Sequence, residues 1–166
     1  MMKLRLLFLL LFFGATAGIC QAQVVYKQAL GTASISFPSR PSEKKDNDLS
    51  LYSLPGDSVS YAAMIVKQAY TYRKYIDTLY KTLQENIQAT VPNCKMVYSK
   101  KIKINDFNAV EFKYIDNRNA SKPLYVYQRA VCVDENMYSF TFSTPYDDAK
   151  NLTTARNNFF ASFVIR

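Results

Sequence analysis

Residues 95–144 alternate between apolar and polar side chains in four runs that are separated by short polar turns. Alternation with a period of two is typical of β-strands that have two different faces. Four such runs in succession predict one antiparallel meander. Because a shift of one residue would turn every side chain to the other face, the same pattern also predicts how the strands pair.

Two of the turns are interpreted as three-residue hairpin loops, at 106–108 and 134–136. The first loop would place Ile102 opposite Phe112, and a longer polar loop at 117–123 joins the middle strands. This register gathers the apolar side chains on one face. They are Ile102, Ile104, Val110, Phe112, Tyr114, Val126, Ala130, Cys132, Tyr138, Phe140 and Phe142.

The opposite face is predicted to be basic, and its candidate binding residues are Lys101, Lys103, Lys113, Tyr127 and Arg129. In this register Glu111 lies between Lys103 and Arg129, while Lys101 opposes Lys113. Like charges in a cross-strand pair repel each other, so an anion or plain solvent would have to relieve them. The face is therefore either a binding surface for an anion or a solvated side of the sheet.

The segments around the meander predict further strands at 33–37, 49–54 and 59–68, with an approach at 24–30 and a polar loop at 39–48. Apolar residues at three- and four-residue intervals predict a helix over 75–90. Its inward stripe is Ile76, Leu79, Tyr80, Leu83 and Ile87.

A second helix is predicted after the meander, with Thr144 as its N-cap and Pro145 at its first position. Asp147 and Asp148 then favour the N-terminal end of the helix dipole. The inward side of this helix is predicted to be Leu152, Ala155, Arg156, Phe159 and Phe163.

The chain resembles the PsbP-like or Mog-type αβα sandwich family in the motif Ile35-Ser36-Phe37-Pro38 with Pro41, the helix midway, the meander and the closing 159–163 segment. The usual glycine of the turn after Ile104 is absent. The resemblance implies an α+β fold in which two main helices flank an antiparallel sheet of about six to seven strands. It also implies mostly binding roles, as in photosystem accessory subunits, GTPase-binding proteins, envelope lipoproteins and secretion chaperones.

The first 22 residues have the pattern of a signal peptide, with Lys3 and Arg5 before an apolar run at 6–13. Cleavage after Ala22 would leave residues 23–166 as a single domain, free in the periplasm or secreted and without a transmembrane span. The alternative is a lipoprotein that is tethered to a membrane through Cys20.

The chain carries a formal charge of +8. Loss of Lys3 and Arg5 with the leader would leave 19 basic and 13 acidic residues, or +6. An exported domain of this charge is not expected to meet nucleic acid, so the predicted partners are an acidic protein or an anionic envelope component. Cys94 and Cys132 are predicted to be buried thiols about 30 Å apart, whereas a disulfide needs Cα atoms within about 7 Å.

The sequence contains no histidine, which excludes catalytic triads and imidazole metal sites. Only Gly31 and Gly56 follow residue 23, so no glycine-rich phosphate loop can form. We therefore expect neither a cofactor nor a metal site. The adjacent carboxylates Asp134-Glu135 and Asp147-Asp148 have structural explanations, in a turn and at a helix start.

The segment before the first helix combines aromatic and basic residues that are favoured at contact surfaces. This possible docking patch is Tyr70, Tyr72, Arg73 and Lys74, although the tyrosines could instead hold the loop onto the helix. The sequence thus predicts a non-enzymatic binding or accessory domain. The alternatives are a carrier with an apolar pocket between helix and sheet, and an enzyme of unrecognised type.

Overall fold

The computed structural model describes residues 25–67, 76–147 and 150–166, and these residues form ten strands and two helices. The strands are β1 (Tyr26–Leu30), β2 (Ala33–Phe37), β3 (Ser42–Asp46), β4 (Leu49–Leu54), β5 (Ser60–Lys67), β6 (Lys95–Ile104), β7 (Phe107–Asp116), β8 (Leu124–Val133), β9 (Asn136–Thr144) and β10 (Val164–Ile165). The helices are α2 (Ile76–Thr90) and α3 (Lys150–Ala161).

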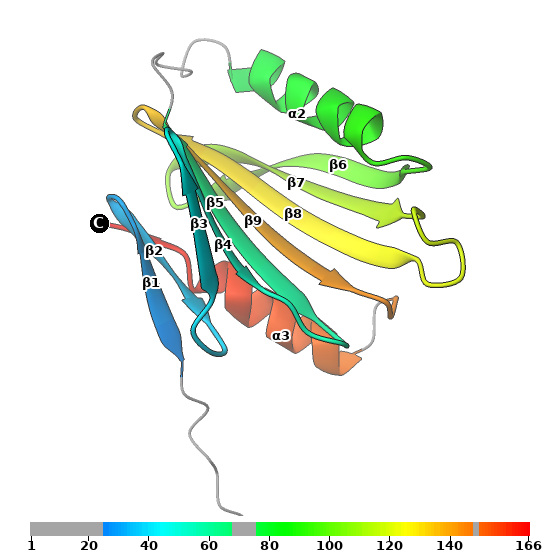
Figure 1. Cartoon of the computed structure of the whole chain (residues 1–166). Coiled ribbons are helices and arrows are strands. Elements are labelled where there is room, and N and C mark those ends of the chain that lie inside the picture. The colour runs from blue at the N-terminus through cyan, green and yellow to red at the C-terminus, as the bar shows by residue number, and fades with distance from the viewer. Residues whose placement is uncertain (1–24, 68–75, 148–149) are drawn as a thin grey trace, which may run out of the picture.

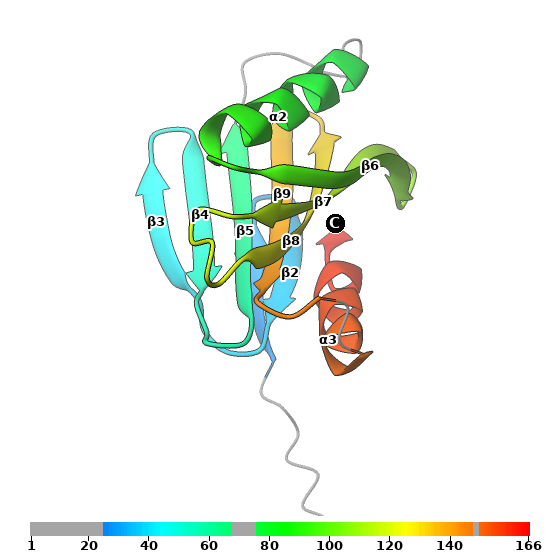
Figure 2. The same ribbon diagram turned by 90° about the vertical axis from the view of Figure 1, so that its right-hand side faces the viewer.

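Seven strands form one antiparallel sheet in the order β3-β4-β5-β9-β8-β7-β6, and β1, β2 and β10 form a separate small sheet. Helix α2 covers one face of the large sheet, while α3 and the small sheet lie against the other face (Figures 1 and 2). The predicted layered α+β class with two main helices is confirmed. The second sheet was not predicted.

Three strands lie where the sequence did not predict them. β1 occupies the predicted approach, β3 lies inside the predicted loop 39–48, and β10 follows α3. All five residues of β3 are exposed and four of them are charged, so its composition matches that of a loop. It is a strand because it pairs with β4 at the sheet edge, where charged side chains discourage pairing with another chain.

Each face of the large sheet carries its own apolar core. On the α2 side, Tyr80 and Ile87 of the helix pack with Phe112, Val126 and Ala130 of the sheet. This confirms the predicted inward stripe for these two helix residues. On the other side, the large sheet packs with the small sheet and α3 through Phe37, Tyr138, Phe140, Phe159 and Phe163.

Four hairpins close through two-residue turns whose first residue has a positive φ: Gly31 (61°), Asn47 (43°), Asn105 (51°) and Asp134 (53°). Glycine adopts this left-handed conformation freely, and asparagine and aspartate tolerate it better than other residues. Two-residue connections are also the commonest hairpins, because their twist matches that of the strands. These four positions therefore decide the register of most of the fold.

The predicted register is confirmed between β7 and β8, where Glu111 pairs with Arg129. It is wrong at both hairpins that were interpreted as three-residue loops. Ile102 pairs with Ala109 rather than with Phe112, and Val133 pairs with Asn136. In each hairpin the predicted pairing is shifted by an odd number of residues, and an odd shift turns the side chains of one strand to the other face of the sheet. Two groups that were predicted to share a face therefore lie on opposite faces: Ile102, Ile104, Tyr138, Phe140 and Phe142 on one, and Val110, Phe112, Tyr114, Val126 and Ala130 on the other.

The predicted start of the last helix is also wrong. β9 continues to Thr144, residues 145–147 form a bend, and α3 begins at Lys150. The Thr144 hydroxyl accepts a hydrogen bond from the Tyr146 backbone N–H at 3.2 Å, so it stabilises a turn. Three of the predicted inward residues of α3, Leu152, Ala155 and Phe159, do pack in the core, and Phe163 is buried just after the helix ends at Ala161.

Cys94 and Cys132 are free thiols, as predicted, but Cys94 is only half-buried rather than buried. Cys132 is buried, and this burial raises the pKa of its thiol to about 11. Burial, followed by the nearby Asp116 carboxylate, also raises the pKa of Cys94. Both thiols are therefore protonated at neutral pH and weakly reactive.

The positive φ of Asn105 can be tested by mutation. Asn105→Ala should lower the free energy of unfolding by about 1 kcal/mol, because a Cβ-bearing residue without a local hydrogen-bonding side chain is strained in the left-handed region. Asn105→Gly should preserve stability, and Asn108→Ala, in the predicted three-residue loop, should have little effect. Urea denaturation followed by circular dichroism measures all three. If Asn105→Ala were as stable as the wild type, the left-handed conformation of Asn105 in this turn would be contradicted.

Candidate functional site

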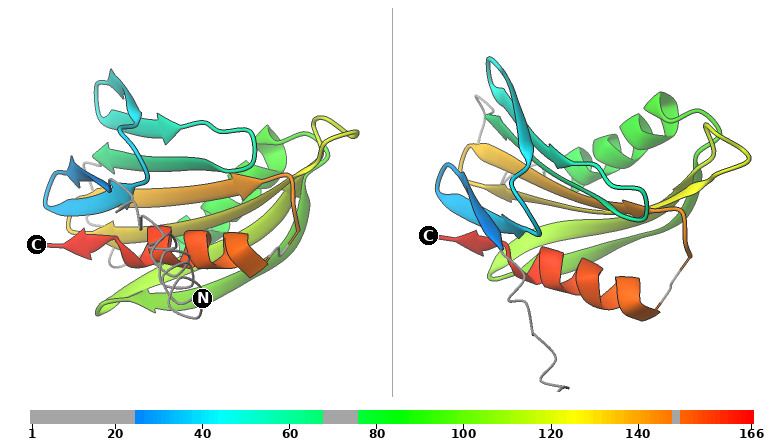
Figure 3. Two further views of the ribbon diagram at one scale, coloured as in Figure 1. Left: turned by 90° about the horizontal axis from the view of Figure 1, so that it is seen from below. Right: turned by 60° about the horizontal axis from the view of Figure 1, so that its bottom comes forward.

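The register lines up two rows of side chains on the α3 side of the large sheet. The first row crosses β6, β7, β8 and β9 as Lys100, Glu111, Arg129 and Phe140. The second row crosses the same strands as Tyr98, Lys113, Tyr127 and Phe142. Seen from below, α3 runs along this side of the sheet, with β6 and β7 beside it (Figure 3).

We define the cationic face as the polar and aromatic residues of these rows together with one arginine of α3. It consists of Tyr98, Lys100, Glu111, Lys113, Tyr127, Arg129 and Arg156.

Glu111 lies at the centre of the cationic face and is only 5% exposed. Its carboxylate contacts Lys100 Nζ at 2.7 Å and Arg129 Nε at 2.6 Å, and it accepts a hydrogen bond from the Tyr98 hydroxyl at 2.9 Å. Burial alone would raise the pKa of Glu111, but the hydrogen bonds from Lys100, Arg129 and Tyr98 outweigh it and lower the pKa. Glu111 is therefore ionised at neutral pH and holds these three side chains in place.

Lys113 is a second buried charge, 8% exposed, in the neighbouring row. Its ammonium group contacts Asp147 Oδ1 at 2.9 Å and lies 5.1 Å from the centre of the Tyr127 ring. Aspartate and ring together compensate for the water that this lysine loses on burial. Asp147 thus ties the segment before α3 to the sheet. The sequence had instead predicted that Asp147 interacts with the dipole at the start of the helix.

Two arginines stack on aromatic rings where α3 meets the sheet. The Arg156 guanidinium of α3 lies 4.0 Å from the centre of the Tyr127 ring, and the Arg129 guanidinium lies 4.6 Å from the centre of the Phe160 ring. Each layer therefore supplies one arginine and one aromatic ring to the other. Stacked guanidinium groups keep their planar orientation, which favours directional contacts with carboxylates and phosphates.

The cationic face, with its neighbour Asp147, holds four basic and two acidic side chains, a local charge of +2. Its interior is buried, but its rim is open to solvent, since the side chains of Lys100 and Arg129 are 55% and 28% exposed. Such an arrangement offers fixed positive charge to an approaching anion, and its aromatic rings offer apolar contact area beside that charge.

The sequence predicted part of this site. Lys113, Tyr127 and Arg129 share the cationic face as expected, but Lys101 and Lys103 lie on the α2 side, where Lys101 contacts Asp77 at 2.8 Å. Lys100 is the residue opposite Glu111, and Tyr98 is the one opposite Lys113, in place of the predicted Lys103 and Lys101. The signal that would have found Lys100 and Tyr98 is the turn-forming Asn105. The predicted docking patch at Tyr70, Tyr72, Arg73 and Lys74 lies outside the described residues.

Among residues 25–67, 76–147 and 150–166, no three or more of His, Cys, Asp and Glu group closely enough to hold a metal ion. In the same ranges, neither helix combines the length and apolar character that a membrane crossing requires.

No family model and no curated protein matches this sequence. Solved structures do match. Cyanobacterial PsbP from Synechocystis has a TM-score of 0.62 at 9% identity, over 92% of this chain and 98% of its own. A Pseudomonas aeruginosa protein of unknown function has a TM-score of 0.58 at 19% identity, over 86% and 97%. The Ran-binding protein Mog1p from Saccharomyces cerevisiae has a TM-score of 0.53 at 4% identity, over 87% and 96%.

Glu111→Gln tests the central ion pairs. At pH 7 this change should lower the free energy of unfolding by about 2 kcal/mol, because it leaves Lys100 and the partly buried Arg129 without their counter-charge. The folded-state pKa of Glu111 lies below its usual value, so its stabilisation is present above pH 4–5 and is lost as the pH falls through the folded pKa. The difference between variant and wild type should therefore shrink in acid.

Glu85→Gln is the matched control, because Glu85 is exposed and contacts Lys81 across one helical turn. It should change stability by less than about 0.5 kcal/mol at any pH. Urea denaturation at several pH values measures both variants. Equal effects of the two changes on the free energy of unfolding would show that the ion pairs of Glu111 contribute no more to stability than an exposed surface pair.

Proposed function

We propose that this chain, which has the PsbP/Mog1 fold, is an exported, non-enzymatic binding domain that docks an anionic group through its cationic face. The anionic group belongs to a partner protein or to a component of the cell envelope. In this proposal the first 22 residues are the signal peptide, and the domain acts in the periplasm or after secretion. Lipid attachment at Cys20 would place the same domain at a membrane.

The geometry of the cationic face is the observation that carries the proposal. Four basic side chains meet two acidic ones, and the basic side chains are held by Glu111, Asp147 and aromatic rings. Side chains that are already ordered lose little entropy when a ligand binds. Charges fixed beside an apolar surface also give a binding site electrostatic specificity and a fast association rate.

The exposure pattern within the face supports a contact role. Lys100 is more than half exposed while its partner Glu111 is buried. The amine therefore reaches Glu111 from the solvent side and can contact a second anion there. Arg129, which contacts the other oxygen of the same carboxylate, is also partly exposed.

The comparisons are consistent with a binding role, since Mog1p, with which the chain shares its fold, is a Ran-binding protein. The absence of histidine throughout the chain removes the commonest general bases and metal ligands. The net charge, which is +8 for the whole chain and +6 without the leader, also favours an anionic partner over a basic one.

The proposal can be tested with the double variant Lys100→Gln, Arg156→Gln. The probes are a hexaglutamate peptide, and vesicles of phosphatidylcholine with and without phosphatidylglycerol. Binding to the preferred probe should weaken roughly tenfold, because each solvent-accessible charge contributes up to about 1 kcal/mol. Isotope-edited NMR of the wild type should place the shift changes at Tyr98, Lys100 and Arg129, and added salt should weaken binding.

Lys101→Gln, Lys103→Gln is the matched control, because it removes the same amount of charge from β6, the strand of Lys100, but on the other face of the sheet. The control should bind like wild type. Equal loss in both double variants would indicate unspecific attraction to net charge, and no loss in either would remove the cationic face as the site. Preference for the peptide indicates a protein partner, whereas preference for phosphatidylglycerol vesicles indicates an envelope lipid.

A further inference from the structure

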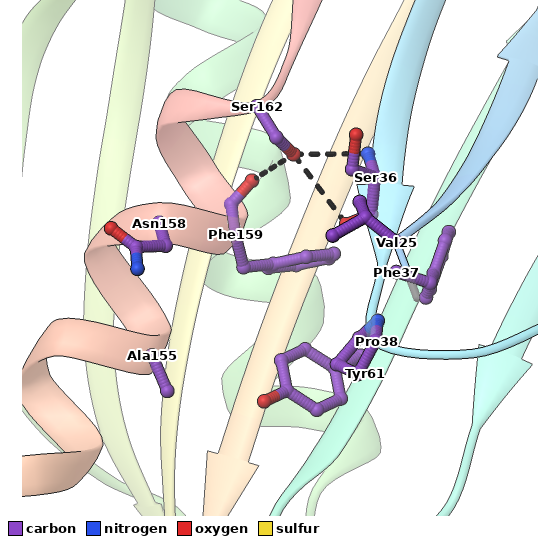
Figure 4. Close-up of a pocket in the computed structure, with 9 residues that line it drawn as sticks. All are labelled: Val25, Ser36, Phe37, Pro38, Tyr61, Ala155, Asn158, Phe159 and Ser162. Atoms are coloured by element: carbon purple, nitrogen blue, oxygen red, sulfur yellow. Dashed lines mark hydrogen bonds between the residues drawn. The ribbon is translucent and has the colours of Figure 1, made fainter. Parts of the chain in front are cut away.

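A cavity of about 260 Å³ lies between α3, β2 and β5, next to the core (Figure 4). It is separate from the cationic face, with which it shares no lining residue. Three of its nine lining residues are aromatic, namely Phe37 of β2, Tyr61 of β5 and Phe159 of α3. Three elements that are distant in sequence thus converge on one hollow.

The aromatic walls are held rigidly. The Phe159 ring lies 5.1 Å from Tyr61 and 5.5 Å from Phe37, at interplanar angles of 69° and 61°. Both are edge-to-face arrangements, which stabilise aromatic pairs beyond their burial. Because Phe37 and Phe159 are 1% and 3% exposed, the surrounding core fixes these two rings. The hollow is therefore formed before any ligand arrives.

The polar groups at the cavity fall into two kinds. The Ser162 hydroxyl is already engaged, since it accepts from the Ser36 backbone N–H at 2.9 Å and donates to the Phe159 carbonyl at 2.7 Å. By contrast, the hydroxyl of the half-buried Tyr61 and the carboxamide of the exposed Asn158 have no hydrogen-bond partner among the described residues, so both are open to solvent at the cavity. Figure 4 shows the Tyr61 hydroxyl directed toward the helix that carries Asn158.

The lining also defines the charge of a suitable occupant. None of the described residues that line the cavity carries a charge at neutral pH, and burial raises the pKa of Tyr61, which keeps its hydroxyl protonated as a donor. A charged ligand would lose its hydration there without an opposite charge to replace it. The volume lies just below the 300–1,000 Å³ that is usual for drug-sized ligands.

We propose that this cavity binds a small neutral ring compound that bears a hydrogen-bond acceptor, such as an aromatic amide. The ring packs against Phe37, Tyr61 and Phe159. The acceptor receives hydrogen bonds from the Tyr61 hydroxyl and the Asn158 carboxamide. This gives the domain a second binding site, of opposite character to the cationic face.

Three probes of nearly equal shape separate the chemistry of the cavity from simple hydrophobic binding: benzamide, which is neutral, benzoate, an anion, and benzylamine, a cation. Isotope-edited NMR titration of the wild-type domain should show benzamide binding with a Kd on the order of 1 mM, as expected for a ligand of this size. The shift changes should centre on Ser36, Tyr61 and Asn158. Both charged probes should bind at least about fivefold more weakly at the cavity.

Variants then test the assigned residues. Tyr61→Phe keeps the ring but removes the hydroxyl, and Asn158→Ala removes the carboxamide, so each should weaken benzamide binding about threefold to tenfold. Asn157→Ala changes the neighbouring exposed residue of α3, which does not line the cavity, and should bind like wild type. Ala155→Leu should fill the cavity and abolish binding, with circular dichroism confirming that the variant folds.

Clear outcomes would overturn this proposal. It fails if benzamide produces no shift changes at the cavity, or if benzoate or benzylamine binds there as well as benzamide. It also fails if both Tyr61→Phe and Asn158→Ala bind benzamide like Asn157→Ala, because the two polar groups would then have no role in recognition.

Discussion

The burial of one carboxylate determines how the layers of this protein fit together. An ionised Glu111 on the covered face of a sheet would be strongly unfavourable without compensation. Lys100, Arg129 and Tyr98 supply it from two neighbouring strands. Arg129 in turn stacks on Phe160 of α3, so the charge in the sheet and the apolar side of the helix depend on each other. The result is a set of basic side chains that are both ordered and partly exposed.

Helix α3 links the two candidate sites through adjacent residues. Phe160 lies against Arg129 in the cationic face, whereas Phe159 forms a wall of the neutral cavity. The two rings are 5.6 Å apart and both are buried. A small shift of α3 would therefore change both sites together, because closely packed side chains transmit displacement. The fold thus places a polar and an apolar candidate site on neighbouring faces of one helix.

Much of the architecture could be predicted from the sequence, and the failures have a common cause. Strict alternation identified β6 to β9, and the apolar stripe of Tyr80 and Ile87 identified α2. The predicted register of two hairpins was wrong because both faces of the large sheet are covered. Each face then needs apolar side chains, so the positions of the apolar residues do not show which face a given residue is on. The turn residues Asn105 and Asp134 carried the missing information. The wrong register of the β6–β7 hairpin also left Lys100 out of the predicted site, because the turn at Asn105 determines that Lys100 pairs with Glu111. The contact of Arg156 with Tyr127 depends on how α3 packs against the sheet, which the sequence pattern does not show.

The pKa of Glu111 in the folded protein tests this account most directly. Titration of its side-chain carboxyl carbon by NMR, with Glu111→Gln for assignment, measures the balance between burial and its three partners. We predict a pKa below the ordinary glutamate value of about 4.3. A value at or above 4.3 would mean that Lys100, Arg129 and Tyr98 do not compensate for burial, which would contradict the proposed organisation of the cationic face.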